Sequence, residues 1–286
     1  MPAAPLVTIV VTNVNQASTL SATLDSIFSQ EEDALECFVV DTSAQDNALE
    51  ILRFFEPRGL HWERVGWDAQ TEAMNRAFAN ARGEFFWWLS GADKLCPWAT
   101  RLTTFVFQNL PQVEWLTSGT PLTWTPHQLA VSAGLADGYT ARAFYAGRNL
   151  KTSAYFQFPI WRSGTVWRRS LWEKSGARIR EALSEAGDFE LWARFFQHAN
   201  LHTLNIPIAG HQADALQLDT NAYWRAAAQH LAQYKKTTAP PTWVRRAHGQ
   251  LARRLPSLRT RLMQGAPLVW ISPPTLECGI GTHFIL

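Results

Sequence analysis

The amino-acid sequence predicts an α/β protein with a mostly parallel central sheet flanked by helices. Apolar runs typical of buried strands alternate repeatedly with segments of helical spacing, up to about Gln108. Strand–helix repeats of this kind form right-handed βαβ units, whose strands lie parallel in one sheet. The chain has 286 residues, 47% of them hydrophobic, which is enough for one large domain with appendages.

The expected strands are short β-branched or aromatic runs bounded by polar residues. In order they are residues 6–12, 37–41, 60–65, 85–89, 113–116, 165–169 and 201–208. The first run has no polar alternation, which is typical of a strand covered on both faces. The second strand ends in Asp41, and the fourth is followed by Ser90 and Asp93.

The expected helices show apolar residues at helical spacing together with start or stop signals. In order they are residues 17–30, 47–55, 71–82, 97–108, 171–175, 188–199 and 220–234. Leu20 and Leu24 fall on one face of the first helix, and Asp46 is a plausible cap for the second. Gly83 follows the third helix, and Pro97 lies in the first turn of the fourth. Residues 121–150, rich in Gly, Pro and Thr, are expected to form a loop-rich acceptor-binding or lid region.

Polar side chains follow the predicted strands at the end where ligands bind in parallel sheets. They are Thr12, Asn13, Asn15, Asp41, Ser43, Ser90 and Asp93. We expect these residues to converge on one crevice. Asp41 could accept hydrogen bonds from a ribose or a base, or it could only form its own turn. Asp93 could ligate Mg²⁺ or Mn²⁺ bridging two phosphates, or it could be a surface acid at a helix start.

Several classes are excluded by missing motifs. There is no G-x-G-x-x-G after the first strand, no phosphate-binding P-loop and no C-x-x-C, H-E-x-x-H or G-x-S-x-G motif. The cysteines Cys37, Cys96 and Cys278 show no paired spacing, which favours reduced thiols in a cytosolic protein. No signal peptide is recognised, and no run reaches the roughly 20 apolar residues that cross a bilayer. We expect a cytoplasmic protein, with peripheral contact at the inner membrane face as a further hypothesis.

A series of segments then points to a known family by its order and spacing. The segments are 7–16 (VTIVVTNVNQ), 39–46 (VVDTSAQD), 70–75 (QTEAMN), 81–84 (ARGE), 88–93 (WLSGAD), 167–174 (WRRSLWEK) and 186–192 (AGDFELW). Together they resemble family 2 glycosyltransferases, which have the Rossmann-like GT-A fold. The resemblance implies a catalytic domain over residues 1–215, followed by a helical, basic C-terminal extension over residues 216–286.

The resemblance implies an inverting hexosyltransferase-type enzyme (EC 2.4) that moves a sugar from a nucleotide-diphosphate donor to an acceptor hydroxyl. Asp188 would be the general base, although an acid at a helix start also has a structural role. Asp93 would hold Mg²⁺ or Mn²⁺. The residues implied for the nucleotide sugar are Thr12, Asn13, Asn15, Asp41, Ser43, Gln70, Asn75 and Ser90. Trp161, Arg162 and Trp167 are implied on the acceptor side. A UDP or dTDP donor and a glycan or lipid-linked acceptor, as in surface polysaccharide or glycoconjugate synthesis, are expected.

The chain departs from the family pattern in three places. The metal motif has one acid, Asp93, where the family commonly has two or three. Trp161-Arg162-Ser163 replaces a Gln-Gln-Glu-like stretch, which predicts a different acceptor specificity. A late Phe-Arg-x-His-like segment is replaced by residues 211–214, so that His211 either reaches the diphosphate or metal, or is a plain loop histidine. A catalytically degenerate nucleotide-sugar-binding protein is therefore an alternative. A nucleotidyltransferase fits less well because no Gly-rich, basic phosphate loop follows the first strand.

The C-terminal segment is basic. No Asp or Glu occurs between Asn221 and Leu276. The segment contains Arg245, Arg246, Arg253, Arg254, Arg259 and Arg261 among apolar residues. Such a segment can lie on an anionic membrane surface, or it can pack on the catalytic domain or on another subunit. A nucleic-acid partner is not expected, because the net charge is only +2 and no nucleic-acid motif is recognised.

Overall fold

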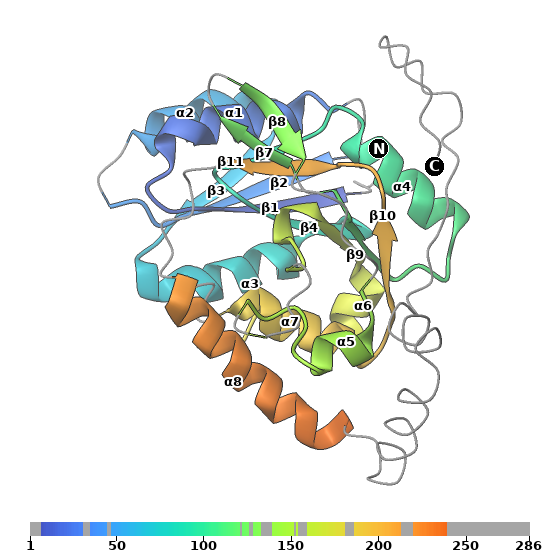
Figure 1. The fold of residues 1–286 in the computed structure, drawn as a ribbon. Coiled ribbons are helices and arrows are strands. Elements are labelled where there is room, and N and C mark those ends of the chain that lie inside the picture. Colours follow the sequence, from blue (N-terminus) through green and yellow to red (C-terminus); the bar gives the residue numbers. More distant parts are fainter. Residues whose placement is uncertain are drawn as a thin grey trace, which may run out of the picture.

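The computed structural model describes residues 7–30, 35–44, 47–120, 122–125, 128–132, 139–151, 153, 159–180, 186–212 and 220–238. The proposed cap Asp46 and the basic segment beyond residue 238 lie outside these ranges. The described residues form a seven-stranded sheet, a four-stranded sheet and flanking helices (Figure 1). This architecture confirms the predicted α/β class.

The elements follow the predicted order closely. The larger sheet contains β1 (Val7–Asn13), β2 (Leu35–Asp41), β3 (Leu60–Arg64), β4 (Phe85–Ser90), β6 (Trp115–Ser118), β9 (Thr165–Arg168) and β10 (Leu201–Leu204). The helices are α1 (Ala17–Phe28), α2 (Ala48–Phe55), α3 (Gln70–Asn80), α4 (Ala99–Asn109), α5 (Ala141–Tyr145), α6 (Arg169–Lys174), α7 (Gly187–Phe195) and α8 (Thr220–Thr238). Three short turns of 3-10 helix are η1 (Glu56–Arg58), η2 (Trp67–Ala69) and η3 (Arg162–Gly164).

The larger sheet is mostly parallel, in the order β10-β6-β9-β4-β1-β2-β3. β1 pairs in parallel with β2 and β4, and β2 pairs in parallel with β3. β9 is the exception, because it runs antiparallel to both β4 and β6. The start of β9 therefore lies at the same edge of the sheet as the carboxyl end of β4.

Helices cover both faces of the larger sheet. α1, α2 and α4 lie on one face, whereas α3, α6 and α7 lie on the other (Figure 1). Ile9 and Val11 of β1 pack in the first of the two hydrophobic cores, and Val10 packs in the second. Because alternate side chains of a strand point to opposite faces, burial on both faces explains the unbroken apolar run of the sequence.

A smaller sheet corrects two predictions. It contains β5 (Asp93–Leu95), β11 (Ala209–Gln212), β7 (Leu122–Thr125) and β8 (Gln128–Ser132), in that order. The prediction of a plain loop at His211 was wrong, because His211 lies in β11 opposite Asp93 of β5. The loop-rich region expected over residues 121–150 contains more regular structure than predicted, since β7, β8 and α5 form there.

α8 packs against α7 and α5, although it lies beyond the predicted boundary at residue 215. Ala227 and Leu231 of α8 are fully or almost fully buried in the same core as α3 and α7. The part of the extension that the structure describes is thus packed on the α/β core. No described helix is both long and apolar enough to cross a membrane.

Candidate active site

The ends of β1 and β2 form a closed hydrogen-bond network. Asn13 Nδ2 donates to Asp41 Oδ1 and to Ser43 Oγ, both at 2.9 Å. The backbone NH of Asn15 also donates to Ser43 Oγ at 2.9 Å. Asn13 and Asp41 are fully buried, and among the described residues Asn13 Oδ1 accepts no hydrogen bond. The structure therefore brings these four predicted residues together and leaves one buried acceptor free for a ligand.

Asp41 also pairs with a residue that the sequence analysis missed. Arg64 Nε donates to Asp41 Oδ2 at 2.6 Å, and Arg64 Nη2 lies 2.5 Å from the same oxygen. Arg64 ends β3 opposite Asp41 in the parallel register. A basic residue at the end of the neighbouring strand was the available signal. Asp41 is thus held rigidly, as suits a residue that positions a nucleoside.

Two further predicted residues lie at the same end of the sheet. Thr12 Oγ1 donates to the carbonyl oxygen of Leu89 at 3.2 Å and accepts from Trp88 Nε1 at 3.4 Å. Gln70 Nε2 donates to Thr42 Oγ1 at 3.3 Å, just beyond β2. Both Thr12 and Gln70 are buried. Their polar groups join β1, β4 and α3 around the ends of the strands.

The structure does not support two other assignments. Asn75 donates to the carbonyl oxygen of Ile179 at 2.9 Å and accepts from its backbone NH at 2.7 Å. Its amide therefore anchors a loop instead of facing a nucleotide. Trp167 is fully buried and packs against Phe78 and Trp192 in the core, where an acceptor cannot reach it. Both side chains make structural contacts in this structure, and their binding roles stay predictions.

Asp188 lies in the first turn of α7 and is 7% exposed. Ala186, just before the helix, has a left-handed backbone with a φ of 58°, a conformation that is unfavourable for alanine. Asp188 Oδ1 accepts hydrogen bonds from the backbone NH of Phe189 and from Tyr223 Oη, both at 2.8 Å. Burial raises the pKa of Asp188, and the charge of Arg162 and the Tyr223 hydrogen bond offset only part of that increase. A raised pKa suits a carboxylate that accepts a proton.

Asp93 is buried at the carboxyl end of β4, beside a cation. Its Oδ2 atom accepts from the backbone NH of Ser90 at 2.6 Å, and Arg162 Nη2 lies 4.0 Å from that oxygen. The Arg162 guanidinium also lies over the ring of Trp88, 4.9 Å from its centroid. Burial raises the pKa of Asp93, while the charge of Arg162 opposes the increase. Arg162 thus acts electrostatically on Asp93 and on Asp188 alike.

His211 and Trp161 complete this side of the site. Their rings stack, with centroids 4.6 Å apart. Burial lowers the pKa of His211, although the charge of Asp93 opposes that shift. Within the described part of the chain, His211 Nδ1 and Trp161 Nε1 are buried polar atoms without a hydrogen-bond partner. Both therefore offer contacts to a ligand.

The predicted metal site does not fit these residues well. Among the described residues, no group of three or more His, Cys, Asp and Glu is placed to hold a metal ion. His211 is paired with Asp93 across the strands. Oδ2 of Asp93 accepts from the Ser90 NH, and Arg162 lies 4.0 Å from the same oxygen. Mg²⁺ and Mn²⁺ favour several oxygen ligands. One carboxylate beside a guanidinium is a poor protein site for either ion.

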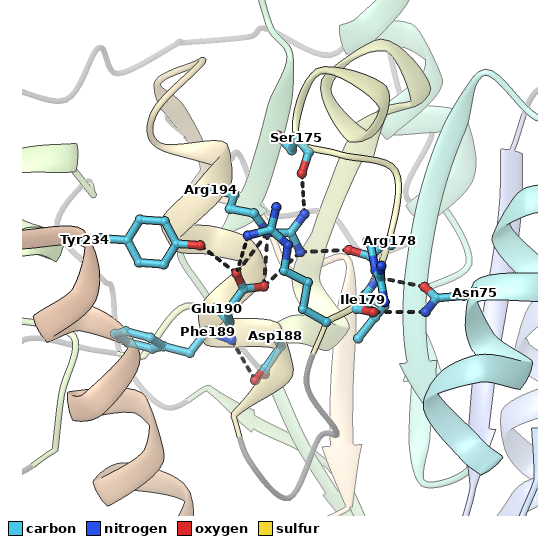
Figure 2. A network of polar contacts seen from close by, with 10 residues as sticks. Asn75, Ser175, Arg178, Ile179, Asp188, Phe189, Glu190, Arg194 and Tyr234 are labelled. Atoms are coloured by element: carbon cyan, nitrogen blue, oxygen red, sulfur yellow. Dashed lines mark hydrogen bonds and ion pairs between the residues drawn. The ribbon is translucent and has the colours of Figure 1, made fainter. Parts of the chain in front are cut away.

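A buried ion pair between Arg194 and Glu190 lies on α7 (Figure 2). Arg194 Nη2 donates to Glu190 Oε2 at 2.8 Å, and its other guanidinium nitrogens donate to Glu190 and to backbone carbonyls. Tyr234 of α8 donates to Glu190 Oε1 at 2.6 Å. This network ties α8 and the segment at residues 175–180 to the helix that contains Asp188.

Comparison with known proteins adds to this geometry. Residues 8–97 match the model of glycosyl transferase family 2. Over these residues the chain is similar to that family. Uncharacterized glycosyltransferases from two strains of Mycobacterium tuberculosis are 28% identical to it over 95 residues. That alignment covers 33% of this chain and 36% of each relative, so the chain spans about a third of the length of these family members.

Solved structures show the GT-A fold of the family. TarS 1–349 of S. aureus in complex with UDP-GlcNAc superposes with a TM-score of 0.63 and 15% identity, over 80% of this chain and 66% of that one. The mannosyltransferase PcManGT of Pyrobaculum calidifontis, in complex with GDP-Man and Mn²⁺, superposes with a TM-score of 0.53 and 16% identity. That superposition covers 92% of this chain and 85% of PcManGT. At these identities the likeness shows the fold alone.

Proposed function

We propose that this chain transfers a sugar from a nucleoside-diphosphate donor to an acceptor hydroxyl, with inversion at the anomeric carbon. The observation that carries the proposal is the placement of Asp188. It is a buried carboxylate oriented by Tyr223, and the charge of Arg162 links it to the end of the sheet where the donor-binding residues lie. Buried acids of raised pKa beside a cation are typical of catalytic groups.

In the proposed reaction, the oxygen of the acceptor hydroxyl attacks the anomeric carbon. Asp188 takes the proton of that hydroxyl as the bond forms. The bond from that carbon to the phosphate oxygen breaks, and its electron pair leaves with the nucleoside diphosphate. Asn13 and Asp41 hold the nucleoside part. Attack from the face opposite the leaving group gives inversion. No step of this proposal passes through a metal ion.

The finer assignments are proposals of the same kind. TarS was solved with UDP-GlcNAc and PcManGT with GDP-Man, which supports a nucleotide-sugar donor. UDP, dTDP and GDP are the nucleoside diphosphates to compare. A hexosyltransferase acting on a glycan or lipid-linked acceptor, in polysaccharide or glycoconjugate synthesis, remains proposed. A cytoplasmic location and membrane contact through the basic C-terminal segment rest on the sequence alone.

The test is Asp188→Asn, which keeps the shape of the side chain and removes the base. We expect release of nucleoside diphosphate from UDP-GlcNAc, dTDP-glucose or GDP-mannose, with glycerol or water as acceptor, to fall about 10²- to 10⁴-fold. Calorimetric affinity for the nucleotide should stay within a few fold. Asp25→Asn, an exposed acid on α1, is the matched control.

Near-normal turnover in Asp188→Asn would remove Asp188 from the mechanism. A wild-type protein that binds nucleotide but gives no turnover with any donor would instead identify the degenerate binding protein, the second candidate. The single acid at the end of β4 favours that alternative, because the leaving diphosphate then depends on few charged groups.

A further inference from the structure

Arg162 reaches the site because of the direction of β9. Arg162 opens η3, directly before β9, and β9 runs antiparallel to β4. η3 packs against β4 and β11, the strands that end near Asp93 and contain His211. The guanidinium is therefore placed at the carboxyl end of the sheet, where ligands bind in folds of this class.

The Arg162 side chain is largely buried yet incompletely bonded. It is 13% exposed, its closest ion pair is at 4.0 Å, and its Nε has no hydrogen-bond partner among the described residues. Its other close contact is the face of Trp88. A guanidinium has five donors and favours paired contacts with carboxylate or phosphate oxygens. A buried guanidinium with unused donors is thus prepared to bind another anion.

The segment from Ser90 to Asp93 offers little to hold a metal ion that would balance the charge of a diphosphate. Ser90 and Ala92 are uncharged, so Asp93 is the single acid of this segment. Arg162 Nη2 lies 4.0 Å from Oδ2 of Asp93, so a guanidinium stands beside the carboxylate that a metal ion would use. A fixed guanidinium and a divalent cation would repel each other across this carboxylate.

We propose that Arg162 binds the diphosphate of the donor and provides the positive charge that stabilises it as the leaving group, in place of a divalent metal ion. This inference rests on the proposed function. When the bond between the anomeric carbon and the phosphate oxygen breaks, the electron pair moves to that oxygen, and the guanidinium stabilises the added negative charge. The sequence-based placement of Arg162 on the acceptor side is thereby replaced by a donor-side role.

The experiment is calorimetric titration with UDP, dTDP and GDP, each in EDTA and in Mn²⁺. The nucleoside and nucleoside monophosphate of the best binder are titrated alongside. We expect the wild-type protein to bind one diphosphate in EDTA with an affinity within a few fold of that in Mn²⁺. Arg162→Gln should weaken diphosphate binding about tenfold to a hundredfold and leave nucleoside binding unchanged, because only the charge-assisted contact is lost. Arg162→Lys should recover part of the loss.

Arg76→Gln, in a half-exposed pair with Glu63, is the matched control and should bind like the wild type. Circular dichroism of each variant separates loss of binding from loss of folding. Binding that requires Mn²⁺ and is unchanged in Arg162→Gln would overturn the inference while the proposed function stands. No binding of any nucleotide by the wild-type protein, with or without Mn²⁺, would instead overturn the proposed function.

Discussion

Asp41 and Asp188 are both buried carboxylates, but their surroundings differ. Asp41 is held by Asn13, by the backbone of Ser43 and by the guanidinium of Arg64 at 2.5 to 2.6 Å. Asp188 accepts two hydrogen bonds on one oxygen, and no ion pair to it is found within the described part of the chain. Burial accordingly raises its pKa. A paired carboxylate is fixed and suits binding, whereas an unpaired one can take up a proton.

The two regions are also built differently. The surroundings of Asp41 come from the ends of neighbouring parallel strands, β1, β2 and β3. The surroundings of Asp188 come from η3, α7 and α8, which are distant in the sequence. The first region therefore depends on sheet pairing, and the second depends on how helices pack. This difference can be tested by breaking each region separately.

The largest effect is expected for Arg194→Met. The change leaves the buried carboxylate of Glu190 with Tyr234 and the half-exposed Arg180 as its remaining partners. We expect a loss of about 3–5 kcal/mol in the free energy of unfolding, as for broken buried pairs. Amide hydrogen exchange should show that α7 and α8 lose protection while β1 and β2 keep it.

The control for Arg194→Met is Arg58→Met, which breaks an exposed pair with Asp25 and should cost about 1 kcal/mol or less. Equal loss of protection across the larger sheet and the helices would show one cooperative unit. The comparison between the two regions would then have no thermodynamic basis.

A smaller effect is expected for Asp41→Asn, measured by thermal denaturation and by titration with the preferred nucleotide. Loss of the charge-assisted bonds to Arg64 should cost about 2 kcal/mol of stability. Nucleotide affinity should fall about tenfold if one such contact to the nucleoside is also lost. Glu63→Gln, in a surface pair, is the control. A destabilised variant of unchanged affinity would make Asp41 purely structural.

The smallest effect is expected for Tyr223→Phe, and it concerns pH. The Tyr223 hydrogen bond lowers the pKa of Asp188, so removing it raises that pKa further. Asp188 acts as a base only when deprotonated, and activity is therefore lost as pH falls through its pKa. In a plot of activity against pH, the acid limb should move to higher pH, with little change on the alkaline side. Tyr234→Phe, which affects Glu190 instead, should leave the limb in place. An unmoved limb in Tyr223→Phe would show that Tyr223 does not act on the base.

The sequence predicted the larger sheet well, because two-sided burial leaves unbroken apolar runs such as that of β1. It missed β5 and β11, which are short and contain polar residues such as Asp93 and His211. β5 and β11 are far apart in the sequence, so their pairing leaves no local pattern of residues that would predict it. The pairing of these strands places Asp93 as a buried neighbour of His211.

The sequence predicted which residues lie together best where they follow parallel strands, as for Asn13 and Asp41. The burial of Trp167 could not be predicted, because an indole on a strand can face a ligand or the core, and Trp167 packs in the core with residues of α3 and α7. Tyr223 and Arg64 were missed because each acts on a partner brought near by tertiary structure.

The reversed direction of β9 has a consequence for anyone who modifies this protein or compares it with others. Residues ahead of a reversed strand, and not those behind it, line the functional edge of the sheet. The three-residue turn η3 lies outside the β-ladder, but it is tied to the sheet, because Trp87 Nε1 donates to the Ser163 carbonyl oxygen at 2.7 Å. A change of one codon at position 162 is enough to add or remove a charge there. Surveys of related chains should thus inspect this turn before any strand end.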